Sequence, residues 1–220
     1  MLYAIIVTNI IRSVIFMKKL FLVAFFKDVA SKLAAFEKNL VGKTITFIPT
    51  ACKVDKVTFH IAEGKAELEK LGLIIDELDI STAPATEISS KLKRNDFIYV
   101  AGGNTFYLLQ ELQKTGADKI IIDEVNAGKL YIGESAGAMI VSANIEYVKL
   151  MDNIKKAPEL QSLAALNLVD FYVVPHYNNP PFEECTQKML DCYSQNLNLI
   201  PISNNELIMV ADTSVKIEQV

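Results

Sequence analysis

The feature that most constrains this chain is a regular alternation between apolar, β-prone runs and amphipathic segments. Strands are expected at residues 20–26, 44–49, 73–79, 96–101, 130–133, 168–175, 199–202 and 206–210. Helices are expected at residues 28–39, 54–71, 104–112, 117–126 and 181–195. Apolar strands that alternate with amphipathic helices indicate a parallel sheet covered on both faces. The pattern therefore predicts an α/β domain.

Composition narrows the classes of function. The chain has 220 residues, of which 51% are hydrophobic, so a single domain can bury a full core. The net charge is −4, and the arginines are Arg12 and Arg94, so the basic face of a nucleic-acid-binding protein is missing. The cysteines Cys52, Cys185 and Cys192 and two histidines fit neither a disulfide framework nor a zinc site. We expect a cytoplasmic protein with no metal and no nucleic-acid partner.

The first 16 residues are strongly apolar but do not form a membrane-spanning pattern. Asn9 and Arg12 interrupt the run, which is shorter than the roughly 20 apolar residues that a spanning helix needs. We therefore expect no membrane association. Residues 1–16 are interpreted as a dispensable extension of a single domain at residues 17–220.

One strand-to-helix turn carries the pattern G-x-S-x-G, as Gly133, Ser135 and Gly137. An apolar strand precedes the turn and a small-residue helix follows it, which is the context of a nucleophile elbow. In that setting the N–H of Ala136 lies at a helix N-terminus, where developing negative charge is stabilised. The alternative is a glycine-rich turn that contains an incidental serine.

A second glycine turn occupies residues 100–106 and also joins a strand to a helix. Asn104 or Thr105 is suited to cap that helix, and the N–H of Gly103 is a candidate second oxyanion donor. A phosphate-binding turn is the alternative. The segment lacks the third glycine of a dinucleotide-binding loop and the lysine of a P-loop.

A serine nucleophile normally needs a base and a residue that orients the base. His176 directly follows a predicted strand, so it is the better candidate for the base. His60 falls inside a predicted amphipathic helix and is expected to be structural or at the surface. Asp152 is the first choice for the orienting acid, Asp170 the second and Glu134 the third.

Three segments together resemble the peptidase E family of serine peptidases, which includes aspartyl dipeptidases and cyanophycinases. They are Val-Ala-Gly-Gly-Asn-Thr-Phe at 100–106, Tyr-Ile-Gly-Glu-Ser-Ala-Gly-Ala at 131–138 and Val-Pro-His-Tyr at 174–177. The resemblance implies a three-layer α/β sandwich of the glutamine-amidotransferase type, with a flavodoxin-like core and a mostly parallel sheet. The serine and the histidine are 41 residues apart, which is too short for the further strands of an α/β-hydrolase.

The resemblance also implies roles for individual residues. Ser135 would be the nucleophile and His176 the general base, with an oxyanion hole formed by the N–H groups of Gly103 and Ala136. Asp152 falls in the region where aspartyl dipeptidases place their acid. No organic cofactor is required.

Substrate contacts are expected from Asn104, Thr105, Glu134 and Tyr177, which flank these groups. Glu134 departs from the Trp or Thr common in the family, and a carboxylate beside the nucleophile would oppose an oxyanion. Strand alternation predicts that it points away. The implied substrates are short peptides, including dipeptides with an N-terminal aspartate. Because no arginine follows Arg94, a lysine or backbone donors would have to bind that aspartate.

Two other functions remain open at this stage. One is a catalytically silent relative that only binds ligands, and the other is an esterase that uses the same serine. A thiol amidotransferase is disfavoured because position 135 is a serine. The sequence leaves the oligomeric state open, including a homodimer.

Overall fold

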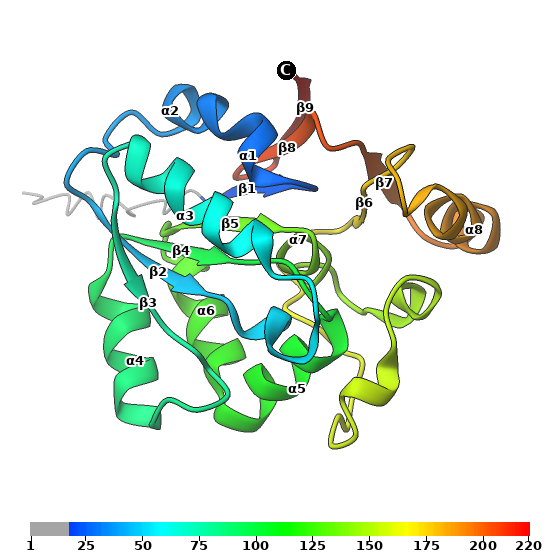
Figure 1. Cartoon of the computed structure of the whole chain (residues 1–220), viewed down its shortest axis with the longest axis horizontal. Helices are drawn as coiled ribbons and strands as arrows, with labels where there is room; N and C mark the ends of the chain where they lie inside the picture. Colours follow the sequence, from blue (N-terminus) through cyan, green and yellow to red (C-terminus); the bar gives the residue numbers. More distant parts are fainter. Residues whose placement is uncertain (1–17) are drawn as a thin grey trace, which may run out of the picture.

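The structure is a computed structural model that describes residues 18–220 (Figure 1), so the interpretation of residues 1–16 lies outside the described part of the chain. Its main sheet has seven strands in the order β3-β2-β4-β5-β1-β8-β9. These strands are β1 (Lys19–Val23), β2 (Thr44–Ile48), β3 (Ile74–Glu77), β4 (Phe97–Val100), β5 (Leu130–Glu134), β8 (Glu206–Ala211) and β9 (Ser214–Gln219). The first five strands in this order are parallel, and β8 and β9 run antiparallel to their neighbours. The predicted α/β fold with a mostly parallel sheet is confirmed.

Helices cover both faces of this sheet (Figure 1). They are α1 (Phe26–Val29), α2 (Leu33–Phe36), α3 (Phe59–Lys70), α4 (Ala85–Arg94), α5 (Thr105–Thr115), α6 (Ala117–Asn126), α7 (Ala136–Met139) and α8 (Glu183–Tyr193). The first three lie on one face, and α4, α5 and α6 lie on the other. Beside α8, strands β6 (Tyr172–Pro175) and β7 (Leu199–Ile202) pair in parallel as a separate small sheet. Among the described residues, no helix combines the length and the apolar character needed to cross a bilayer.

Alternation along the strands builds the two layers of core. On β1, Leu20 and Leu22 face the core under α4–α6, whereas Phe21 and Val23 face the core under α1–α3. All four side chains are fully buried, which explains why the strand is apolar at every position from Leu20 to Val23. The continuous apolar run therefore correctly indicated a strand here, although apolar and polar residues do not alternate along it.

Several elements differ from the sequence-based expectation. Residues 28–39 do not form one helix, because α1 and α2 are separated by a 3-10 turn at Ala30–Lys32. Helix α4 was not predicted: it is polar apart from Ala85, Ile88 and Leu92, and it buries the last two. Strand β9 was not predicted either, because it is an exposed edge strand with little apolar patterning.

The parallel register brings several functional turns to one edge of the sheet. Strands β4, β5 and β1 are neighbours in the sheet, and their carboxyl ends therefore lie side by side. The glycine turn follows β4, and the G-x-S-x-G turn follows β5. This edge is where open α/β sheets bind their ligands.

Candidate active site

Ser135 occupies a strained turn between β5 and α7. Its φ is 49°, a conformation that non-glycine residues rarely adopt. A Cβ on Gly133 would lie 2.4 Å from the Gly137 oxygen, and a Cβ on Gly137 would lie 2.1 Å from the Val100 oxygen. Only glycine fits at both positions. The motif therefore makes a reversal that is tight enough to present the serine, as a nucleophile elbow does.

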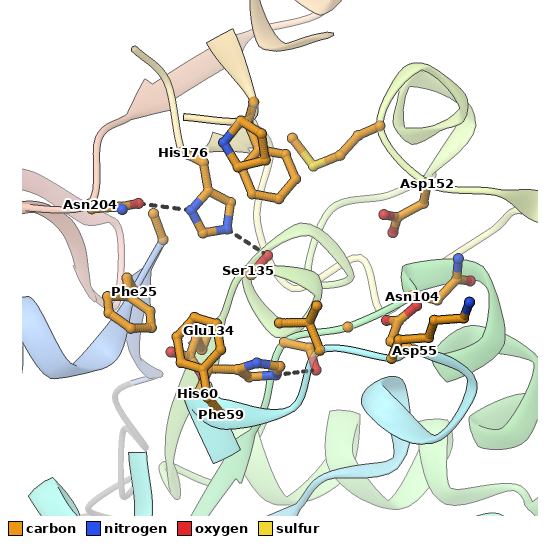
Figure 2. A pocket seen from close by; sticks show the side chains of 18 of the residues that line it. Phe25, Asp55, Phe59, His60, Asn104, Glu134, Ser135, Asp152, His176 and Asn204 are labelled. Carbon is orange, nitrogen blue, oxygen red and sulfur yellow. Dashed lines mark hydrogen bonds between the residues drawn. The ribbon is translucent and has the colours of Figure 1, made fainter. Parts of the chain in front are cut away.

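His176 directly follows strand β6 and contacts Ser135 (Figure 2). Its Nε2 lies 3.0 Å from Ser135 Oγ, which is within hydrogen-bonding distance. Its ring stacks on Phe182 with the ring centroids 4.6 Å apart. Burial lowers the pKa of His176 from its ordinary value of 6.5, so the imidazole is neutral at pH 7 and can accept a proton.

The Nδ1 atom of His176 is hydrogen-bonded to Asn204 and not to an acid. Nδ1 lies 2.8 Å from Oδ1 of Asn204, which sits in the turn between β7 and β8. Since the amide oxygen is an acceptor, Nδ1 carries the proton and donates it, which leaves Nε2 free to accept from the serine. The N–H of Asn204 donates to Asn179 Oδ1 at 2.8 Å, and this bond holds the turn in place.

Asp152, the first choice for the orienting acid, does not contact His176. Its Oδ2 accepts a hydrogen bond from the Thr105 N–H at 2.7 Å, at the first turn of α5. Burial raises the pKa of Asp152 to about 6. Asp170 is exposed and lies in a separate hollow. The structure therefore corrects the sequence-based choice and puts Asn204 in that position. Sequence reasoning missed Asn204 because it searched for a carboxylate.

Glu134 points away from the serine, as strand alternation predicts. Its Oε1 accepts from the Phe26 N–H and its Oε2 accepts from the Tyr99 hydroxyl, both at 2.9 Å. Burial raises the pKa of Glu134, and the hydrogen bond from Phe26 opposes that shift. Because both carboxylate oxygens bind protein groups, Glu134 is less available to a substrate than the sequence suggested.

Two backbone N–H groups beside Ser135 make no hydrogen bond within the described residues. They belong to Gly103 and Ala136, the candidate oxyanion donors. Gly103 has a φ of 137°, and a Cβ there would lie 2.3 Å from the Ala51 carbonyl carbon, so this position also requires glycine.

This geometry agrees with comparisons against known proteins. The profile of Peptidase family S51 matches residues 21–218. The chain belongs to peptidase family S51. This S51 chain is 57% identical to an uncharacterized peptidase of Listeria monocytogenes, over 90% of its own length and 97% of that protein. It is 44% identical to a Shewanella oneidensis protein named Peptidase E, over 60% of its own length and 53% of that protein.

Solved structures agree with the S51 assignment. A crystal structure of a Listeria monocytogenes protein with a provisional peptidase E name has a TM-score of 0.89 and 55% identity, covering 93% of this chain and 99% of that one. A peptidase from an acI-B1 actinobacterium has a TM-score of 0.68 at 24% identity, over 94% and 89% of the two chains, and shows the shared fold. The family and its relatives identify the chain as a peptidase.

The S51 peptidase has a cavity of about 680 Å³ around Ser135. Figure 2 shows a polar side that carries Asp55, Asn104 and Asp152, and an opposite side that carries Phe25 and Phe59. The Asn104 side chain accepts from the Tyr107 N–H and so caps α5, as the sequence suggested. A substrate in this cavity would therefore meet charged groups on one side of the serine and aromatic rings on the other.

The remaining predicted residues of the S51 site are divided between the cavity and its surroundings. Thr105 and Tyr177 are not among the residues that line the cavity. His60, expected to be structural or at the surface, does line it, and its Nε2 lies 3.2 Å from the Gly102 oxygen. Within residues 18–220, no group of three or more His, Cys, Asp or Glu side chains is arranged to hold a metal ion.

Proposed function

We propose that this S51 peptidase is a serine-type enzyme that hydrolyses short peptides through an acyl-enzyme on Ser135. The observation that carries the proposal is the 3.0 Å contact between Ser135 Oγ and His176 Nε2 at the edge of the cavity. A hydroxyl within hydrogen-bonding distance of a neutral imidazole is the arrangement that activates a serine.

The proposed reaction has two steps. His176 Nε2 takes the hydroxyl proton while Ser135 Oγ bonds to the peptide carbonyl carbon, and the N–H groups of Gly103 and Ala136 stabilise the oxyanion. The C–N bond then breaks, and the leaving amine takes the proton from His176. Water attacks the ester with His176 again as the base. This second step releases the acid product and restores the serine.

In this mechanism Asn204 orients the base without adding charge. Its Oδ1 accepts from Nδ1–H at 2.8 Å and thereby selects the tautomer that leaves Nε2 able to accept a proton. An uncharged partner stabilises the imidazolium less than an aspartate would. The enzyme therefore depends more on its oxyanion hole than a Ser-His-Asp enzyme does.

Dipeptides with an N-terminal aspartate are the first substrates to test. An aspartate side chain needs a cation or several N–H donors, and the cations among the described residues that line the cavity are Lys56 and Lys156. Lys156 is paired with Asp55. An acidic substrate would have to compete with Asp55 for that lysine.

The deciding experiment is an assay of N-terminal Asp, Glu, Ala and Leu dipeptides and a simple ester, with wild type and Ser135→Ala. We expect peptide hydrolysis by the wild type, no hydrolysis by the variant, and fluorophosphonate labelling at Ser135. Full activity of Ser135→Ala would refute the mechanism. Absence of both labelling and turnover would favour a ligand-binding relative, and turnover of the ester alone would favour an esterase.

A matched pair of variants tests whether a lysine gives specificity for an acidic side chain. Lys156→Met should raise KM for Asp-X dipeptides more than for Leu-X dipeptides if Lys156 binds the acidic side chain. Lys155→Met is the control, because Lys155 is exposed and does not line the cavity. Equal effects of Lys156→Met on the two substrates would rule out this role for Lys156.

A further inference from the structure

The second histidine of the chain lies beside the glycine turn, close to the nucleophile. His60 is near the start of α3, and its Nε2 lies 3.2 Å from the Gly102 carbonyl oxygen (Figure 2). A Cβ built on Gly102 would lie 3.6 Å from His60 Nε2 and 3.2 Å from Ser135 Cβ. Gly102 is therefore held between the imidazole of His60 and the serine.

The atom that His60 contacts belongs to the peptide group of the oxyanion donor. The Gly102 carbonyl and the Gly103 N–H are the two polar ends of one planar unit, so fixing the oxygen also fixes the direction of the N–H. Because a carbonyl oxygen only accepts, His60 Nε2 must be the donor in this bond. A hydrogen bond at the oxygen also polarises the peptide group and strengthens its N–H as a donor.

Glu134 lies close to the same turn, and the Gly102 N–H is one of the groups that oppose the rise in the pKa of this carboxyl. The Glu134 carboxylate accepts hydrogen bonds from the Phe26 N–H and the Tyr99 hydroxyl. The Gly102 carbonyl oxygen is bound by His60. The Gly103 N–H makes no hydrogen bond within the described residues. These contacts fix the turn and leave that single donor available.

We infer that His60 is a positioning residue, which aims the Gly103 N–H at the oxyanion that forms on Ser135. The inference rests on the proposed function, because it assigns a cause to the oxyanion hole of that reaction. His60 is not a second base: its Nε2 is bound to Gly102, and Ser135 Oγ already contacts His176.

The test compares two substitutions at one position. His60→Leu fills similar space without a donor, whereas His60→Gln offers an amide N–H to the Gly102 oxygen. Removing an oxyanion donor costs about 10²–10³ in kcat, so a donor that remains but is misdirected should cost less, about 10- to 100-fold. We expect that fall in kcat for His60→Leu with KM changed less than about twofold, and substantial recovery of kcat in His60→Gln.

A transition-state analogue separates positioning from a purely structural role. Affinity for a peptidyl boronate, which forms a tetrahedral oxyanion on the serine, should fall in parallel with kcat in His60→Leu and recover in His60→Gln. Binding of the substrate to an inactive Ser135→Ala background should be unchanged by His60→Leu. Glu69→Gln is the control, because Glu69 is exposed on the same helix and does not line the cavity.

Three outcomes would overturn the inference: unchanged kcat in His60→Leu, a change in KM alone, or a glutamine variant no better than the leucine variant. If His60→Leu fails to fold, His60→Phe, which also lacks a donor, takes its place, and its boronate affinity should again be lower than that of His60→Gln. Full activity of Ser135→Ala would instead refute the proposed function. The two failures are therefore distinguishable.

Discussion

Replacing Asn204 with aspartate tests the most unusual feature of the site, the uncharged partner of His176. The change keeps the size and the acceptor of the side chain but adds a negative charge next to the imidazole. The Nδ1–Oδ1 distance is 2.8 Å, which puts the two charges roughly 4 Å apart. At an effective dielectric constant of about 20 that separation corresponds to ~4 kcal/mol, or roughly 3 pKa units, as an upper bound.

The measurable consequence is a shift of the acid limb of kcat/KM. A carboxylate next to an imidazole raises its pKa by about 1–3 units. In the wild type, burial lowers the pKa of His176 below 6.5, so the neutral base persists into acid solution. In Asn204→Asp the imidazole keeps its proton to higher pH, and activity should appear only at a pH about 1–3 units higher than in the wild type.

The assay is kcat/KM for a hydrolysed short peptide from about pH 4 to pH 9. Asn205→Asp is the matched control, because it adds the same charge one residue away, on an exposed side chain. Its acid limb should stay within a few tenths of a unit of the wild type. Asn204→Ala should lower kcat/KM by at least about tenfold, since the base loses its orientation. An unmoved acid limb in Asn204→Asp would refute the assignment of Asn204.

Two further predictions concern Gly103 in the glycine turn and the carboxyl group of Asp152. Gly103→Ala should lower kcat by about 10²-fold or more. The new Cβ would lie 2.3 Å from the Ala51 carbonyl carbon, so the N–H of residue 103 would be displaced. A wild-type kcat in this variant would exclude that N–H as an oxyanion donor. Burial raises the pKa of Asp152 from 3.8 to about 6, so the stability linked to this group is fully present below pH 3.8 and is lost as the pH rises through 6. Asp152→Asn should abolish that loss of about 3 kcal/mol, seen in denaturant unfolding at pH 4 and pH 7.5; parallel pH dependence of the two proteins would contradict it.

The sequence was sufficient to predict the parts of the fold and site that depend on local patterns. Strand β1 is apolar at every buried position. Close backbone contacts require glycine at the two elbow positions and at Gly103. The sequence also predicted that Ser135 and His176 lie close together, because each residue directly follows a strand. Local sequence patterns do not predict that β6 pairs with β7 in a separate sheet. This pairing places His176 outside the main sheet.

Asn204 was missed for a physical reason that concerns the acids of the site. A carboxylate close to the serine was the expected partner of the base, but Asp152 and Glu134 bind backbone N–H groups elsewhere. Asp152 accepts the Thr105 N–H at the start of α5, and Glu134 accepts the Phe26 N–H at the start of α1. Both carboxylates satisfy N–H groups that the first turn of a helix leaves without partners.

The contacts of these two carboxylates follow from the position of the site at one edge of the sheet. Strands β1 and β4 end at this edge, and the first residue of the helix after each strand, α1 or α5, donates its N–H to a carboxylate. The carboxylates at this edge therefore bind helix N–H groups. The side-chain amide of Asn204 is a sufficient partner for His176, because burial already keeps the His176 imidazole neutral. Because Glu134 and Asp152 bind these N–H groups and do not contact His176, neither carboxyl raises the pKa of the base by direct contact. An enzyme with this arrangement would retain its neutral base at lower pH than one whose histidine faces an aspartate.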